Sequence, residues 1–91
     1  MKALYLDARD RYQKIVSLKE DGLIIAEVRG DADLLKLIAQ LVNQTDLNIS
    51  EINRVEVNTQ GGSFTGVRLS LSVARSFVFA LGLPEGSVVS G

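Results

Sequence analysis

The sequence predicts a small α/β domain built on a mixed β-sheet. Three stretches with strand-like patterns come first, and the Asp21-Gly22 pair between the second and third is typical of a tight hairpin. Apolar residues then follow a helical period, alternate again, and return to a helical period. The order is β-β-β-α-β-α-β. Because the helices cross over to parallel strands after an antiparallel start, we expect both to pack on one face of the sheet.

Five segments are expected to be strands, because apolar and polar residues alternate in them. They are residues 2–7, 12–19, 23–29, 54–58 and 87–89. Polar side chains of the first four strands are predicted to share the second face of the sheet, which is then half-solvated. They are Tyr5, Asp7, Ser17, Lys19, Glu27, Arg29, Glu56 and Asn58.

The two helices are predicted at residues 33–45 and 63–81. Asp31 or Asp33 can cap the first helix, whose broad apolar face lies opposite Lys36 and Gln40. The second helix is expected to end at Gly82. Residues 46–52 are expected to be a simple connection.

The second helix has apolar side chains on two sides. One stripe contains Phe64, Val67, Leu71, Ala74 and Val78, and the other contains Gly66, Leu69, Val73, Phe77 and Ala80. A helix on a sheet needs one apolar side, so the second stripe must meet something else. Either the first helix covers it within the chain, or a helix of another molecule does.

An intermolecular helix contact is the sharper of these two hypotheses. Small residues at four-residue spacing would let a partner helix approach closely along the flank. The predicted interface residues are Gly66, Leu69, Ser70, Val73, Ala74 and Phe77.

Composition excludes several kinds of chemistry. The chain has 91 residues, a formal net charge of −1, and neither cysteine nor histidine. Disulfides, thiolate nucleophiles and imidazole bases are therefore absent, and we expect no catalytic residues, no metal site and no cofactor. Basic residues are dispersed, which disfavours direct nucleic-acid binding. Charges in the first ten residues, with no unbroken run of 18 apolar residues, predict a cytoplasmic protein without a membrane contact.

The stretch "QGGSFTGVR", residues 60–68, lies between a predicted strand and a helix. Such a turn can hold an anion, yet this one lacks the lysine and the glycine spacing of the two common phosphate loops. We expect Gly61 and Gly62 to make the turn, Ser63 to cap the helix, and Gly66 to permit close packing. The alternative is a nucleotide or anion site formed by Gly61, Gly62 and Ser63, up to Phe64, with Asp7 nearby.

The segment "GSFTGVR", with the Leu-rich helix before it and the helix after it, resembles the N-terminal lobe of the TsaB family, also called YeaZ. The weaker stretch "ALYLD…SLKEDGLIIAE" is similar to the opening strands of that family. The resemblance implies one lobe of the actin-like, ribonuclease H-like fold. It also implies a role in making threonylcarbamoyladenosine on tRNA, as a scaffold that pairs through its two helices with a TsaD-like protein or with itself, with a TsaE-like ATPase.

The chain departs from the family at three places. Glu56 and Asn58 occupy strand positions where the family tends to have small residues. Asp7 is followed by Ala8-Arg9 where family members usually have Thr-Ser, which disfavours a nucleotide at that turn. The sequence stops at residue 91, after the fifth strand. We therefore expect residues 1–91 to be a self-contained single lobe without the second lobe that completes the family's cleft.

Overall fold

The predicted order of elements is confirmed by a computed structural model, which describes all 91 residues. The strands and helices start and end within two residues of the predicted positions; only a 3-10 turn, η1, was not predicted. The elements are β1 (Lys2–Asp7), β2 (Lys14–Glu20), β3 (Leu23–Gly30), α1 (Leu34–Thr45), η1 (Ile49–Glu51), β4 (Ile52–Val57), α2 (Phe64–Leu81) and β5 (Val88–Ser90).

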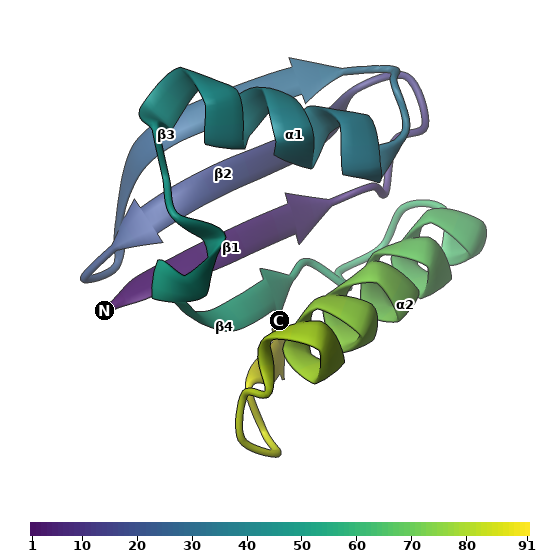
Figure 1. The fold of residues 1–91 in the computed structure, drawn as a ribbon. Helices are drawn as coiled ribbons and strands as arrows, with labels where there is room; N and C mark the ends of the chain where they lie inside the picture. The colour runs from purple at the N-terminus through teal and green to yellow at the C-terminus, as the bar shows by residue number, and fades with distance from the viewer.

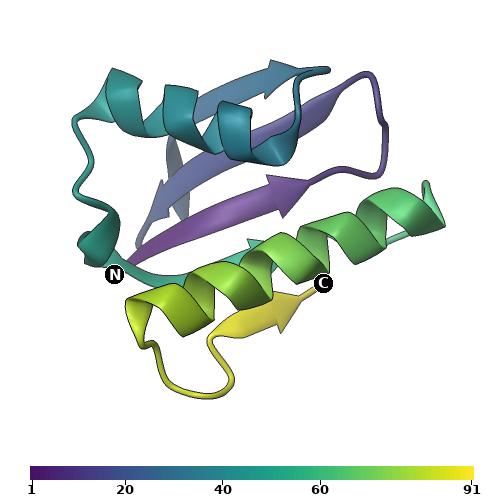
Figure 2. The same ribbon diagram turned by 45° about the vertical axis from the view of Figure 1, so that its right-hand side comes forward.

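The five strands form one mixed sheet in the order β3-β2-β1-β4-β5. β2 pairs antiparallel with both β1 and β3, whereas β4 pairs parallel with β1 and with β5. Both helices lie on the same side of the sheet, α1 over β2 and β3 and α2 over β4 and its neighbours (Figures 1 and 2). The predicted mixed α/β architecture is therefore confirmed.

Local sequence signals place the turns and the helix ends. Asp21 and Gly22 both have positive φ, 52° and 84°, as the tight β2–β3 hairpin requires. Asp33 caps α1, since its side chain accepts a hydrogen bond of 3.1 Å from the backbone N–H of Lys36. Asn48 and Glu51 form a capping box around η1. Each turn therefore follows from residues within four positions of it.

The hydrophobic core lies mainly between α1 and the sheet. α1 buries Leu34, Leu37, Ile38 and Leu41 against the strands. The strands contribute Leu4, Leu6, Val16, Leu18, Val28, Ile52, Val55 and Val57. From α2 only Ala74 joins this buried cluster. The two helices are thus held very differently: α1 is an integral part of the core, and α2 lies at its margin.

The second face of the sheet carries a network of paired charges. Lys19 Nζ and Arg54 Nη2 each lie 2.8 Å from a Glu56 oxygen, and Glu27 is bonded by the Ser17 hydroxyl and by Arg29. Burial acts to raise the pKa of Glu56, but Lys19 and Arg54 outweigh it and lower the pKa overall. The predicted polar face is confirmed, and its charges are neutralised within the chain.

Candidate functional site

Helix α2 is hardly buried by the rest of the chain. Of its 18 residues only Ser70 and Ala74 are buried, although apolar residues lie on most of its circumference. A surface helix normally hides its apolar stripe, so this helix leaves an unusual amount of apolar surface exposed. We therefore take the side of the molecule that carries α1 and α2 as the candidate site.

The row of small residues in α2 faces the chain's own sheet. Ser70 and Ala74 are each 0% exposed. At Gly66, a Cβ atom would lie only 1.8 Å from the backbone oxygen of Ala8. The predicted role of Gly66, Ser70 and Ala74 in close approach by a partner is therefore wrong. Their small side chains instead allow α2 to pack closely on the β1–β2 turn and the strands of its own chain.

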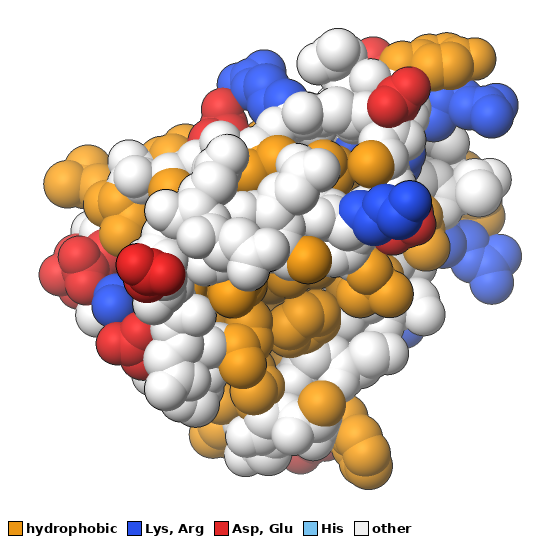
Figure 3. All heavy atoms as spheres, turned by 45° about the horizontal axis from the view of Figure 1, so that its top comes forward, with side chains coloured by type: hydrophobic (Ala, Val, Ile, Leu, Met, Phe, Trp, Pro, Cys, Tyr) orange, Lys and Arg blue, Asp and Glu red, His pale blue; other side chains and the backbone are white.

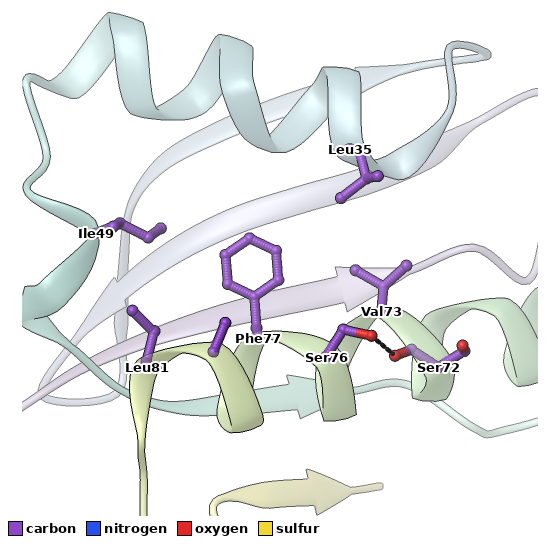
Figure 4. A pocket seen from close by; sticks show the side chains of 8 residues that line it. Leu35, Ile49, Ser72, Val73, Ser76, Phe77 and Leu81 are labelled. Carbon is purple, nitrogen blue, oxygen red and sulfur yellow. Dashed lines mark hydrogen bonds between the residues drawn. The ribbon is translucent and has the colours of Figure 1, made fainter.

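Two of the other predicted interface residues, Val73 and Phe77, line a groove between the two helices, whereas Leu69 lines a separate hollow beside the β1–β2 turn. Val73 and Phe77 of α2 face Leu35 of α1, and Ile49 of η1 and Leu81 close one end. The groove is lined mostly by apolar side chains and has a volume of about 380 Å³. Figure 4 shows the Phe77 ring standing between the helices, with Leu35 and Val73 directed toward each other.

The space-filling view shows this groove as part of a continuous apolar band. Hydrophobic side chains gather on the side that carries the helices, between strips of polar atoms (Figure 3). Leu69 is 43% exposed and Leu35 is 61% exposed. α1 thus covers the second stripe of α2 only in part. That a helix of another molecule covers the rest stays a prediction.

Helix α2 is also long and apolar enough to cross a membrane by length and composition. Its 18 residues have a mean hydropathy of 1.3, and 11% of them are buried in the fold. Its ends, however, are fixed to the sheet. The N–H of Ser63 at its start donates to Arg9, and the chain after Gly82 returns to pair as β5 with β4. A helix tied down at both ends is suited to packing sideways against another surface.

The glycine loop at the start of α2 has the structural role predicted for it. Gly61 and Gly62 have φ values of 66° and 72°, which disfavour other residues. A Cβ at Gly62 would lie 2.4 Å from the Cβ of Arg9. The Ser63 hydroxyl accepts a hydrogen bond of 3.2 Å from the N–H of Gly66. The loop is therefore shaped to pack on the β1–β2 turn.

Asp7 is bonded to a side chain of the same turn. Arg9 donates to both of its carboxylate oxygens, from Nε at 2.9 Å and from Nη2 at 2.8 Å, and its backbone N–H also donates to Asp7. Arg9 Nη1 donates to the carbonyl oxygen of Gln60 at 2.6 Å. The hydrogen bonds from Arg9 are the main reason why the pKa of Asp7 is lowered. A guanidinium thus links β1 to the glycine loop.

These bonds bear on the predicted anion or nucleotide site. The groups that converge beside the loop, the Asp7 carboxylate and the Gln60 carbonyl, are acceptors, and both are bonded to Arg9. Of the loop amides, that of Ser63 donates to the Arg9 carbonyl oxygen at 2.9 Å. These acceptor groups favour a cation over an anion, and the Arg9 guanidinium of the same chain is the cation bonded to them.

Sequence reasoning missed three residues of this region. Ile49 belongs to a 3-10 turn that was expected to be a simple connection, and Leu35 is 61% exposed although the apolar side of its helix was expected to pack in the core. Arg9 was noted only as a departure from a family pattern, although it makes most of the bonds at the loop. The spacing Asp7-x-Arg9 is a local signal for the ion pair between these two side chains. The second bond of Arg9 has no such signal, because its acceptor, Gln60, lies 51 residues away in sequence.

Comparisons with known proteins agree on one family. Residues 25–90 match the family model described as TsaD, tRNA N6-adenosine threonylcarbamoyltransferase. A protein of Buchnera aphidicola subsp. Baizongia pistaciae, named tRNA threonylcarbamoyladenosine biosynthesis protein TsaB, is 35% identical over 52 residues, which are 57% of this chain and 24% of that protein.

Solved structures match nearly the whole fold. YeaZ from Pseudomonas aeruginosa superposes on 99% of this chain with a TM-score of 0.82 and 23% identity, and a second structure, described as similar to peptidase YeaZ from the same organism, gives 0.78 and 23%. This chain spans 42% of each of those chains. The fold is therefore that of a TsaB/YeaZ-like, actin-like or ribonuclease H-like lobe, and the chain belongs to the TsaD family of tRNA N6-adenosine threonylcarbamoyltransferases and their relatives.

Proposed function

We propose that the chain is a TsaB-like interaction subunit that supports threonylcarbamoyladenosine biosynthesis on tRNA without catalysing a step itself. The observation that carries the proposal is the exposed apolar groove between α1 and α2, lined by Leu35, Val73 and Phe77. Burying such a groove against partner helices would remove apolar surface from water, which is the main favourable term in protein association. The similarity to TsaB is the reason for placing this proposed role in threonylcarbamoyladenosine biosynthesis.

The residues of the chain support a non-catalytic role. No three Asp or Glu side chains come together in a group that could hold a metal ion. Asp7 is the most buried carboxylate, and both of its oxygens are bonded to Arg9. A carboxylate held in a bidentate ion pair is a poor general base, because its proton affinity is lowered.

The partner on the groove is, in this proposal, a TsaD-like protein or a second copy of this chain, with a TsaE-like ATPase joining the assembly. Co-purification of tagged chain with the TsaD-like protein of the same source tests it, together with light scattering of each component alone. We expect a complex of defined mass from the wild type.

A paired substitution in the groove sharpens this test. Val73→Asp with Phe77→Asp places two charges in the apolar groove and should abolish the complex. Ile24→Asp is a matched control, because Ile24 is also apolar and 55% exposed but lies on β3. If the groove variant bound the partner as tightly as the control does, the proposal would be wrong.

A further inference from the structure

The flank of α2 that faces away from α1 forms a second surface, distinct from the groove. Phe64, Arg68, Arg75 and Phe79 are spaced by 4, 7 and 4 residues, so they fall within about 60° of one another around the helix. On the same wheel Val73 and Phe77 lie on the opposite side. Phe64 is 75% exposed and Phe79 is 89% exposed. We call these four residues the outer flank.

The arginines of the outer flank have no acidic partner in the chain. Seven ion pairs link charged groups of this protein, and none of them includes Arg68 or Arg75. The Arg68 guanidinium instead lies 5.6 Å from the centre of the Phe64 ring. By contrast, every carboxylate on the second face of the sheet is paired.

The absence of acidic residues extends to the whole helical layer. Neither α1 nor α2 contains Asp or Glu, while they carry Lys36, Arg68 and Arg75. The remainder of the chain holds seven lysines and arginines against eleven carboxylates. The layer that presents the apolar groove is therefore positive on a chain whose net charge is −1.

We propose that the partner of this layer is a different protein, not a second copy, and that it lays an acidic amphipathic helix along the outer flank. Its carboxylates face Arg68 and Arg75, and its apolar side chains cover Phe64 and Phe79. This inference rests on the proposed function, since it names the chemistry of the partner at the same pair of helices. A second copy would bring the same cations and no helical carboxylate to pair with them, and like charges brought together oppose association.

The test compares charge variants of the full chain in binding to the purified TsaD-like protein of the same source, measured by calorimetry. Arg68→Glu with Arg75→Glu should weaken binding by about tenfold or more, and the wild-type affinity should fall as salt is raised. Arg68→Lys with Arg75→Lys should keep most of the affinity, since the charge remains. Arg11→Glu is the control, because Arg11 is an exposed arginine outside α1 and α2 that makes no ion pair in the chain. This reversal should change the affinity by less than about twofold.

The outcomes separate this inference from the function on which it rests. If the groove variant Val73→Asp/Phe77→Asp fails to bind but the outer-flank reversal binds normally, the inference is overturned and the proposed function stands. If the wild type does not bind the TsaD-like protein, the inference is overturned; if it also forms no dimer with itself, the proposed function fails too. A wild-type chain that forms a tighter dimer with itself, or that binds tRNA or phosphatidylglycerol vesicles through Arg68 and Arg75, would also overturn the inference.

Discussion

Replacing Gly66 with alanine tests how closely α2 lies on the β1–β2 turn. The added Cβ would lie 1.8 Å from the Ala8 oxygen and 2.8 Å from the Ala8 carbonyl carbon. Both are backbone atoms, so neither can rotate away as a side chain could. An ordinary carbon–oxygen contact is about 3.3 Å or longer, and the helix and the turn must therefore separate by roughly 1.5 Å.

Three effects set the size of the change in stability. Forcing an extra methyl group into a packed contact costs about 1–3 kcal/mol. Separation also weakens the 2.9 Å hydrogen bond from the Ser63 N–H to the Arg9 oxygen, which contributes about 1 kcal/mol. Alanine favours a helix over glycine by about 1 kcal/mol, which offsets part of the loss. We expect a net loss of roughly 1–3 kcal/mol, or about 4–24 °C in Tm for a domain of this size.

Urea unfolding followed by circular dichroism measures this difference. Ser72→Ala is the matched control, because Ser72 is exposed on the same helix and also gains helix propensity. It should stay within about 0.5 kcal/mol of the wild type. A Gly66→Ala chain as stable as the wild type, or more stable, would refute the docking of α2 on Ala8.

Three further predictions concern charge and ligands. Folding lowers the pKa of Asp7, Glu27 and Glu56, so the unfolded chain binds more protons in acid, and the stability present at neutral pH should be lost progressively below about pH 5. Urea unfolding across pH 3–7 should show that the free energy of unfolding depends less steeply on pH in Glu56→Gln than in the wild type. An equal slope in both would count against the charge network around Glu56. Arg9→Met should accelerate amide hydrogen exchange in residues 61–67, whereas Arg11→Met should not; equal protection in both would show that Arg9 does not hold the loop. Titration with ATP and magnesium should leave the amide signals of Gly61–Phe64 unchanged, because the Ser63 N–H already donates to the Arg9 carbonyl oxygen and the groups beside the loop, the Asp7 carboxylate and the Gln60 carbonyl, do not attract a phosphate. Saturable shifts there would favour the nucleotide alternative.

The turns and the order of elements along the chain could be predicted because their causes are local. Asp21-Gly22, the Asp33 cap and the Ser63 cap each act within a few residues, and strand alternation was regular. The charged side of the sheet was also predictable, since alternation fixes which residues share a face. The pairing of Lys19 with Glu56 then follows from the register of neighbouring strands.

The orientation of α2 could not be predicted from periodicity. Apolar residues occupy two sides of this helix, so hydrophobicity does not decide which side faces the sheet. The decision comes from size: Gly66, Ser70 and Ala74 let the helix approach the strands closely, which leaves Val73 and Phe77 toward the groove. The bridge from Arg9 to Gln60 was likewise hidden, because it joins segments 51 residues apart.

The central claim is that the groove between α1 and α2 is where this protein binds its partner. Amide hydrogen exchange of the chain, alone and saturated with the purified TsaD-like protein of the same source, tests it most directly. The account predicts slower exchange in residues 35–42 and 69–81 on binding, with β2 and β3 unchanged. Protection confined to the charged side of the sheet or to residues 61–64, with α1 and α2 unaffected, would contradict it.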